Sequence, residues 1–291
     1  MSQLFDRKVK LVLASNLDPE KWEVDGRFFR AFTRETTIGE LRMAFRIEKS
    51  LKKQPNKCEI TINNLVRRTR AEFQTSPAHI AFSAGYAGTV KQLYKGDILY
   101  APSRKEGTEW LTEVQAGTGA QAFRHGRVSQ TFKAGTDLKT LVVRAAKSMG
   151  LSVPKSIQEG KEMLSKIRSG VTLDGLSHRE MSRLLDAKGL GWSVQDDQLQ
   201  IIRDGDTNKA QAIVISPELG MIGSPEMGTP EAKGKAPILK VKTLLDGDIT
   251  PGGLLQVNSR DITGNFKILR VIHVGDTHGQ PWYSEVEARA L

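Results

Sequence analysis

The sequence predicts a mainly β protein that carries an α/β insert. Between His79 and Gly135, apolar residues recur in short bursts separated by glycines, which is typical of successive strands joined by tight turns. From Thr136 the apolar spacing changes to that of amphipathic helices. After Ile238, strand-like patterns resume and continue almost to the end of the chain. Two β regions separated by a helical segment are therefore expected.

The stretch before His79 predicts strands and one short helix. In residues 41–48 apolar and mostly charged side chains alternate, which predicts a half-buried antiparallel strand. The patterns indicate, in order, a strand at 8–15, a loop or short strand pair at 16–37, the strand at 41–48, a turn at 52–57, a strand at 58–62 and a basic helix at 65–73.

The bursts between His79 and Gly135 are too short and irregular for a buried helix. A meander of this kind cannot cover its own edge strands, so it needs closure into a barrel or pairing with another copy. The bursts comprise Ile80 and Phe82, then Val90, Leu93 and Tyr94, then Ile98 and Tyr100, then Trp110, Leu111 and Val114, and finally Val128 and Phe132.

Residues 105–208 indicate a small α/β unit. A helix is predicted over 136–149 and ends at Gly150, a typical C-terminal cap. Ser177-His178-Arg179-Glu180 matches a capping box at the start of a second helix, which Gly189 ends. Residues 192–201 predict a hairpin whose turn contains Asp196-Asp197. The expected helical faces are Leu138, Leu141, Val142, Ala145 and Met149, and then Met181, Leu184 and Leu185.

Residues 217–237 hold four prolines and four glycines and predict a long irregular connection or an exposed arm. The segments that follow predict a second antiparallel sheet or barrel, with strands at 238–241, 254–257, 266–274 and 282–288. Lys95-Gly96-Asp97-Ile98 in the first β region loosely resembles Asp246-Gly247-Asp248-Ile249 in the last.

Composition bounds the class of protein. The 291 residues are 38% hydrophobic and 26% charged, as in soluble globular proteins. No apolar run reaches the length of a membrane-spanning helix, and the N-terminus lacks the apolar core of a signal peptide. The single cysteine, Cys58, cannot form an internal disulfide and fits a reducing compartment.

The net charge of +10 is uneven along the chain. Residues 1–150 contain 26 Lys and Arg against 15 Asp and Glu, a balance of +11, whereas residues 151–291 contain 17 against 18, a balance of −1. The basic half could face nucleic acid or an acidic partner, or it could be a solvated surface, which is the commoner case for scattered charge.

Residue patterns with catalytic or metal-binding chemistry are weak. Cys58 and His79 could form a nucleophile and base, but Cys58 alternates with Ile60 and is expected to pack as a small apolar side chain. His273, Asp276 and His278 could bind a metal, but no further ligand is evident.

Three further patterns are expected to be structural. Asp196-Asp197 is expected to be a solvated hairpin turn. Gly117 and Gly119 lack the third glycine and following helix of a dinucleotide loop. Arg67-Arg68-Arg70 could touch phosphates, but without interleaved aromatic residues a solvated helix face is expected. We therefore assign no catalytic, cofactor-binding or metal-binding residue.

The chain resembles the baseplate hub proteins of contractile-tailed bacteriophages, a family that includes late-control and tail-hub proteins. The resemblance covers about residues 58–288 and depends on the order of short motifs, since residues 1–40 match nothing sharply. The motifs are residues 60–65, 82–86 and 93–98, then 110–114 through 128–149, and then 223–226, 244–252 and 271–277 with Trp282.

This resemblance implies two tail-tube-like antiparallel β-barrels and a small α/β domain. The expected domains are a first barrel at 1–104, the α/β insert at 105–208 and a second barrel at 209–291, with 217–237 as an arm to a neighbour. Three subunits would form a pseudo-sixfold ring. This non-enzymatic ring would join the tail tube to the central spike and let DNA pass.

The resemblance also implies partners and a location. The expected partners are two further copies of the chain, the spike, the tail tube or tube-initiator proteins, other baseplate proteins, the tape measure protein, and genomic DNA in transit. The protein would be assembled in the host cytoplasm and reside in the virion. No cofactor is expected. Since phosphate contacts would slow DNA transit, the basic excess of residues 1–150 should face outward or toward acidic partner surfaces.

Two alternative functions follow from other features. The pI of 9.6 allows a non-specific nucleic-acid-binding protein built on small barrels. Some tail hubs carry lytic domains, so a peptidoglycan hydrolase is a third alternative. However, no paired carboxylates or Cys/His arrangement supports it, and the hub accounts for the whole chain.

Overall fold

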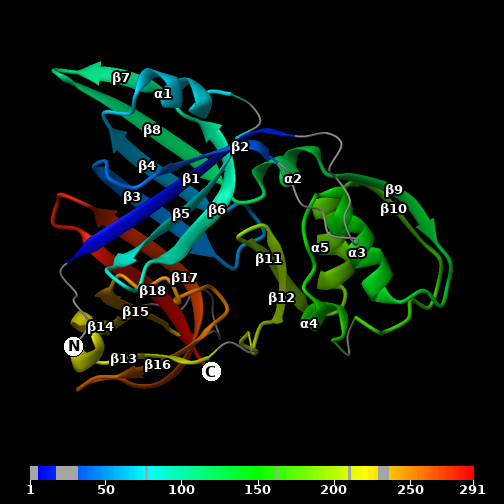
Figure 1. The fold of residues 1–291 in the computed structure, drawn as a ribbon. Coiled ribbons are helices and arrows are strands. Elements are labelled where there is room, and N and C mark those ends of the chain that lie inside the picture. The colour runs from blue at the N-terminus through cyan, green and yellow to red at the C-terminus, as the bar shows by residue number, and fades with distance from the viewer. Residues whose placement is uncertain (1–5, 18–31, 76–77, 161–162, 209–210, 229–235) are drawn as a thin grey trace.

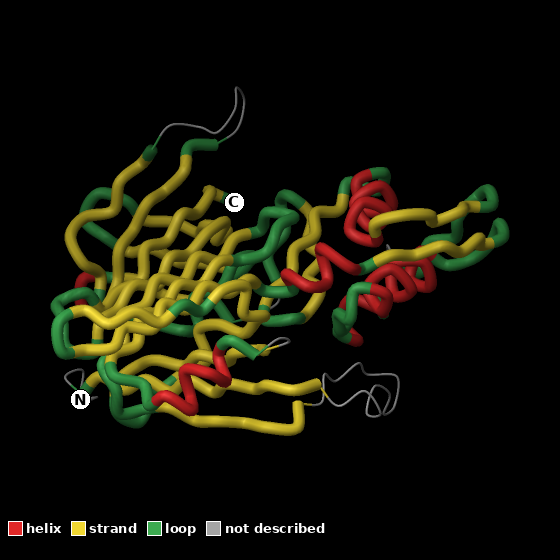
Figure 2. The backbone as a smooth tube through the Cα atoms, turned by 90° about the horizontal axis from the view of Figure 1, so that it is seen from above, coloured by secondary structure: helices red, strands yellow, loops and turns green. Residues whose placement is uncertain are grey.

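A computed structural model describes residues 6–17, 32–75, 78–160, 163–208, 211–228 and 236–291 of the chain. Strands from both ends of the sequence lie together, and a helical insert projects to one side of them (Figure 1). Figure 2 shows the same separation, with the insert helices at one end of the molecule and the large sheet at the other. The mainly β fold with an α/β insert is therefore confirmed.

The first β region buries alternate residues of each strand, as its pattern predicts. In β3, Met43, Phe45 and Ile47 are buried while Arg46 is exposed. The sheet order is β3-β4-β8-β6-β5-β1-β2, and β7 pairs with β8. The elements are β1 (Arg7–Leu17), β2 (Phe32–Ile38), β3 (Met43–Ser50), β4 (Lys57–Asn63), α1 (Arg67–Phe73), β5 (Ala78–Tyr86), β6 (Lys91–Tyr100), β7 (Ser103–Glu106) and β8 (Glu109–Gly117).

The second β region has the order β14-β15-β18-β17, with β16 beside β17 and a short parallel pairing of β13 with β16. Its elements are β13 (Ile213–Ile215), the 3-10 helix η1 (Pro217–Leu219), β14 (Met221–Met227), β15 (Ile238–Leu244), β16 (Leu254–Asn258), β17 (Thr263–Asp276) and β18 (Trp282–Ala290). The predicted strands at 8–15, 41–48, 58–62, 238–241, 254–257, 266–274 and 282–288 are confirmed.

Strand β17 joins the two β regions. It pairs with β18 along most of its length. Its first part, residues 263–267, also pairs with β16, and its second part, residues 270–276, pairs instead with β3 of the first region. A register shift between Ile268 and Arg270 marks the change of partner. The two regions therefore share one 14-stranded sheet.

An aromatic cluster packs across this seam. The ring centroids of Phe45 and Phe82 are 4.8 Å apart, and Trp282 of the second region lies 5.5 Å from Phe45 and 6.4 Å from Tyr86. Gly275 provides the space, because a Cβ atom there would lie only 2.4 Å from the Phe45 ring. The core of the first region therefore includes Trp282, which lies more than 200 residues after Phe45 in the sequence.

The insert has its own hydrophobic core. Helix α3 buries the predicted apolar face, and Gly150 follows it with a left-handed φ of 67° as a C-terminal cap. The elements are α2 (Ala120–His125), β9 (Arg127–Phe132), α3 (Leu138–Ser148), α4 (Lys155–Gln158), β10 (Val171–Leu176), α5 (Ser177–Asp186), β11 (Leu190–Gln195) and β12 (Gln198–Arg203). None of the described helices is both long and apolar enough to span a membrane.

Two expectations for the insert are wrong. Helix α2 lies within the stretch 79–135, which was expected to contain only strands. The capping box at Ser177 does not form, because α5 begins at Ser177 itself without a side-chain cap. The Ser177 hydroxyl lies 2.7 Å from that of Ser148 in α3, and Arg183 binds the Glu180 carboxylate. The Ser177 hydroxyl and the Glu180 carboxylate, which would form the capping box, are therefore used in helix packing and in a local ion pair.

The prediction of an irregular connection at 217–237 is wrong for residues 217–227. Residues 217–227 form η1 and the edge strand β14, which pairs with β15 despite Pro225. An edge strand tolerates proline because one side of its backbone has no strand neighbour. Residues 229–235 of the expected arm and residues 18–31 of the expected N-terminal loop lie outside the described ranges.

Candidate functional site

The turn of the β11–β12 hairpin contacts the first β region through several charged side chains. The turn residues Asp196 and Asp197 both have left-handed backbones, with φ of 49° and 64°. Asn-Gly is the favoured pair in such a turn, and aspartate adopts this conformation at some cost in free energy. Contacts outside the hairpin can offset this cost.

Asp196 neutralises a buried lysine. Lys49 lies at the end of β3 on the core-facing side, and its side chain is only 2% exposed. Its Nζ lies 2.7 Å from Asp196 Oδ2, while Asp196 Oδ1 accepts a hydrogen bond from the Lys95 backbone N–H. A buried ammonium ion requires such a partner, so the insert supplies the counter-charge for the β region.

Asp197 contacts a buried histidine that already has one carboxylate neighbour. The pairing of β5 with β6 places His79 opposite Asp97, with Nδ1 3.3 Å from Asp97 Oδ1. The His79 Nε2 lies 2.9 Å from Asp197 Oδ2. Burial lowers the pKa of His79, but the carboxylates of Asp197 and Asp97 outweigh it and raise the pKa above its ordinary value.

The second carboxylate oxygen of Asp97 accepts a hydrogen bond from the Gln121 backbone N–H at the start of α2. The expectation that no helix follows Gly117 and Gly119 is therefore wrong, since Gly119 is the N-cap of α2. This helix start is occupied by a carboxylate of the same chain.

Amide side chains extend the junction along the hairpin. The buried Asn56 donates to the carbonyl of Val194 and to Gln195 Oε1, and it accepts a hydrogen bond from the Ser50 backbone N–H. Gln195 in turn donates to the carbonyl of Ser50 at 2.8 Å. The loop between β3 and β4 and the end of β11 are thus joined by reciprocal hydrogen bonds.

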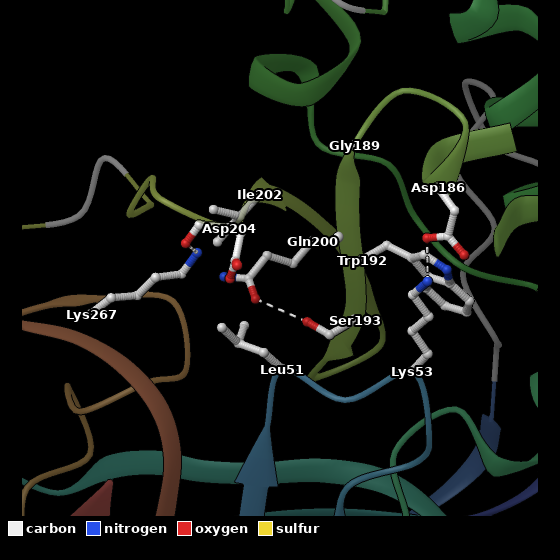
Figure 3. Close-up of a pocket in the computed structure, with 11 residues that line it drawn as sticks. Leu51, Lys53, Asp186, Gly189, Trp192, Ser193, Gln200, Ile202, Asp204 and Lys267 are labelled. Carbon is white, nitrogen blue, oxygen red and sulfur yellow. Dashed lines mark hydrogen bonds and ion pairs between the residues drawn. The ribbon is translucent and has the colours of Figure 1, made fainter. Parts of the chain in front are cut away.

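A cavity of about 530 Å³ lies beside this junction, between the hairpin and both β regions (Figure 3). Leu51, Trp192 and Ile202 form part of its wall. Lys53 pairs with Asp186 at one side, and Lys267 donates to the carbonyls of Arg203 and Asp204 at the other. In Figure 3 Lys53 points toward Asp186 and Lys267 points toward Asp204, so each lysine connects a β region with the insert.

The other sequence-predicted residues are placed in separate surroundings. Cys58 is buried in the first core as expected, and burial raises the pKa of its thiol. His273 is buried against Ser284, and burial lowers its pKa to about 3. Asp276 pairs with Arg42, and His278 is exposed. Among the described residues, no three His, Cys, Asp or Glu side chains are grouped to hold a metal.

The expectation of a solvated Asp196-Asp197 turn is wrong, since both side chains are at least three-quarters buried and paired with groups of the first β region. Arg67 and Arg68 are exposed as expected, but Arg70 stacks 3.7 Å from the centre of the Trp110 ring, an aromatic contact that sequence spacing did not indicate. Two features of the sequence could have indicated this junction. They are Lys49 at an apolar position of β3, and an Asp-Asp pair in a turn where Asn-Gly is usual.

Comparison with known proteins agrees with this architecture. A sequence profile of the family described as baseplate hub gp41 matches residues 24–288. The chain belongs to this family. The resemblance to baseplate hubs is therefore confirmed, and the chain is a structural protein of a phage tail baseplate. No curated protein sequence matches it.

Solved structures share the fold of this hub-family chain. The 43 kDa tail protein of prophage MuSo2 from Shewanella oneidensis has a TM-score of 0.64 at 9% identity, over 97% of this chain and 96% of that one. A tail protein of Neisseria meningitidis has a TM-score of 0.66 at 8% identity, over 98% and 97%. The Escherichia coli c3393 protein, a type VI secretion component, has a TM-score of 0.59 at 13% identity, over 86% and 73%. At these identities the likeness concerns the fold alone.

Proposed function

We propose that three copies of this chain form a pseudo-sixfold baseplate hub ring that joins the tail tube of a contractile phage to its central spike and lets DNA pass. In this proposal each β region is a tail-tube-like barrel, and the two regions of three subunits provide six similar units. The protein acts as a symmetry adaptor without catalytic activity. Assembly takes place in the host cytoplasm, and the ring resides in the virion.

The observation that supports a ring most directly is the course of the large sheet. Within the described residues, the sheet path runs from β14 at one end to β2 at the other, and each pairs with one neighbour along that path. Open edges tend to pair with another chain. Contact between two different edges is heterologous, and such contacts close into rings when the rotation permits. On β14, Ile222 and Met227 are 37% and 45% exposed.

The division into residues 1–104, 105–208 and 209–291 remains part of the proposal. Three separate hydrophobic cores support three units. Strands β7 and β8 pair with each other across the first proposed boundary, and β8 also pairs with β4. This pairing favours an insert that begins after Gly117.

The proposed partners are the spike, the tail tube or its initiator, other baseplate proteins and the tape measure protein. A spike partner draws support from the neighbouring structures, since one is a Francisella PdpA–VgrG complex, with a TM-score of 0.57 at 7% identity. The c3393 protein is itself described as similar to the T4 tail proteins gp27 and gp5.

The test is cryo-electron microscopy of the purified protein, alone and co-expressed with its spike, together with its mass in solution. A threefold ring with an open channel is expected in at least one state. Replacing Ile222 and Met227 together by Lys should reduce the trimer at least tenfold without lowering the melting temperature. The matched control replaces the exposed Val90 and Leu164 by Lys.

A monomer in both preparations would contradict the proposed ring. Steeply salt-dependent DNA binding by that monomer would favour the nucleic-acid-binding alternative instead.

A further inference from the structure

Many of the contacts between the insert and the β regions are polar, and the apolar core of the insert is separate from theirs. The insert core gathers side chains from Ala122 to Leu199, and the two β cores contain none of them. The contacts described above are ion pairs and hydrogen bonds, including Lys49 with Asp196 and Asn56 with the end of β11. Polar interfaces between units of one chain usually permit relative motion.

His79 lies within this contact, and each of its two ring nitrogens faces a carboxylate. Nδ1 faces Asp97 and Nε2 faces Asp197, and the imidazole is only 5% exposed. A neutral imidazole has one N–H, so one of its nitrogens would present a lone pair to a carboxylate. Only the protonated ring satisfies both neighbours, and removing that proton turns one attraction into a repulsion.

We propose that docking of the insert on the first β region is coupled to protonation of His79, so that the β11–β12 turn is held tightly when the imidazole is charged and loosens when it loses a proton. The device resides in three side chains from separate elements, namely His79 of β5, Asp97 of β6 and Asp197 of the hairpin turn. This coupling is a property of a single chain and does not depend on formation of the proposed hub ring.

The other groups around the imidazole are two paired lysines, a neutral phenol and an uncharged alanine. Lys95 Nζ lies 3.8 Å from Asp197, and Lys49 is paired with Asp196. Tyr94 is close to both Asp97 and Asp197, and burial raises the pKa of its phenol well above the ordinary value, so it stays neutral. On the other side of β5, β1 places the uncharged Ala14 opposite His79.

The direction of the pH effect follows from the carboxylate neighbours. They raise the pKa of docked His79 above its ordinary value of 6.5. In the released state His79 keeps Asp97, which lies opposite it on β6, but loses Asp197, so the released state has the lower pKa. Docking is at full strength below the pKa of the released state and weakens by up to about tenfold per pH unit above it, until His79 is deprotonated in the docked state as well.

The backbone conformation of the turn also favours release of the hairpin from the first β region. Asp196 and Asp197 hold left-handed conformations that are unfavourable for aspartate. Their side-chain partners in the first β region offset this only while the hairpin is docked. Loss of the His79 charge removes one of these contacts, so the turn can relax.

The experiment is amide hydrogen exchange of the purified full chain between pH 5.5 and 8.5, corrected for the intrinsic exchange rate. The Lys95 amide is the reporter because its N–H is donated to Asp196 of the insert. Its protection should be constant at acid pH and should fall by up to about tenfold per pH unit above the pKa of His79 in the released state. The reference is the Leu244 amide, which is donated to Gly220 in the second β region and should change its protection less with pH than Lys95 does.

Two variants test the role of His79. His79→Gln removes the charge and should give low Lys95 protection at every pH. Asp197→Asn leaves His79 with one carboxylate and keeps a residue that tolerates the left-handed turn, so it should lower protection at acid pH and flatten the profile even if His79→Gln does not fold. The matched control is His125→Gln, an exposed histidine of the insert, which should leave the wild-type profile unchanged.

A wild-type Lys95 protection factor that does not vary across this pH range would overturn the proposal. So would a wild-type pH profile that persists in Asp197→Asn. A fall at Leu244 as steep as that at Lys95 would show global destabilisation in place of local release and would equally contradict it.

Discussion

At the scale of single residues, one glycine decides how the two β regions meet. Gly275 lies in the part of β17 that pairs with β3, and Phe45 and Trp282 pack against its α-carbon. Arg7 adds a guanidinium 5.2 Å from the Trp282 ring and donates to the backbone carbonyls of Asp276 and Gln280. The seam therefore depends on the absence of a side chain at one position.

Gly275→Ala should destabilise the whole chain. The new methyl group would meet the Phe45 ring at 2.4 Å and the Trp282 ring at 2.7 Å, and neither ring is free to move in a packed core. Overpacking of this kind costs about 1–3 kcal/mol, measurable as a lower midpoint of urea unfolding. Gly205→Ala is the control, since its methyl group would meet nothing within 4 Å. Equal stability of the two variants would contradict the packing argument.

At the scale of elements, the β11–β12 hairpin is held by groups of the first β region. Its two-residue turn is built from aspartates, and their partners Lys49 and His79 lie in β3 and β5. Asn56, in the loop between β3 and β4, donates from its amide nitrogen to Val194 and Gln195 at the end of β11, while its amide oxygen accepts a hydrogen bond from the Ser50 backbone N–H. These contacts make the hairpin the docking element of the insert.

Asn56→Ala should weaken this docking more than it weakens the sheet. The substitution leaves the Ser50 N–H and the Val194 carbonyl without their Asn56 partner in a buried place, which costs about 1–3 kcal/mol. Limited proteolysis should cleave the variant faster between the insert and the β regions. Asn258→Ala, at an exposed position of β16, should leave the cleavage rate unchanged. Cleavage of both variants at the wild-type rate would argue against a role for Asn56.

At the scale of the whole molecule, the charge asymmetry of the sequence is partly balanced within the chain. Basic groups of the first half meet acidic groups of the second, as in the pairs Arg42–Asp276, Lys49–Asp196, Lys53–Asp186, and Lys91 with Asp246 and Asp248. An acidic surface was expected as a partner of residues 1–150, and part of it is supplied by the same chain. These lysines and arginines are less available to bind DNA than the sequence balance indicates.

The unfolding free energy should be highest near pH 6.5, because the fold favours opposite charge states of two buried histidines. It favours neutral His273 and protonated His79. His273 is neutral in the folded state, with a pKa of about 3, so the unfolded chain binds an extra proton below pH 6.5 and stability falls by about 1.4 kcal/mol per pH unit. The folded pKa of His79 is raised, so its contribution is complete below pH 6.5 and is lost as the pH rises through that raised value.

Urea unfolding between pH 5.5 and 8 measures both limbs. His273→Asn retains an amide within reach of Ser284 and should flatten the acid limb, whereas His79→Gln should flatten the alkaline limb. A stability profile that either variant leaves unaltered would contradict the assigned pKa direction for that histidine.

Local sequence determined the secondary structure and much of the core. Period-2 alternation in residues 41–48 and 58–62 places Phe45, Ile47 and Ile60 on the buried side, and the apolar spacing of α3 does the same for Leu141 and Val142. These patterns can be recognised in the sequence because each depends on neighbours a few residues apart. Together with the order of its motifs, they also indicated the hub family.

Only the tertiary structure decided how these elements meet. Nothing near Gly275 indicates that β17 changes its partner from β16 to β3, and nothing near Asp197 indicates a histidine more than 100 residues away. The capping box at Ser177 and the solvated Asp196-Asp197 turn failed as predictions for the same reason, since distant groups outcompeted local ones. Pairing between distant segments depends on the free energy of the whole arrangement, which no short stretch of sequence contains.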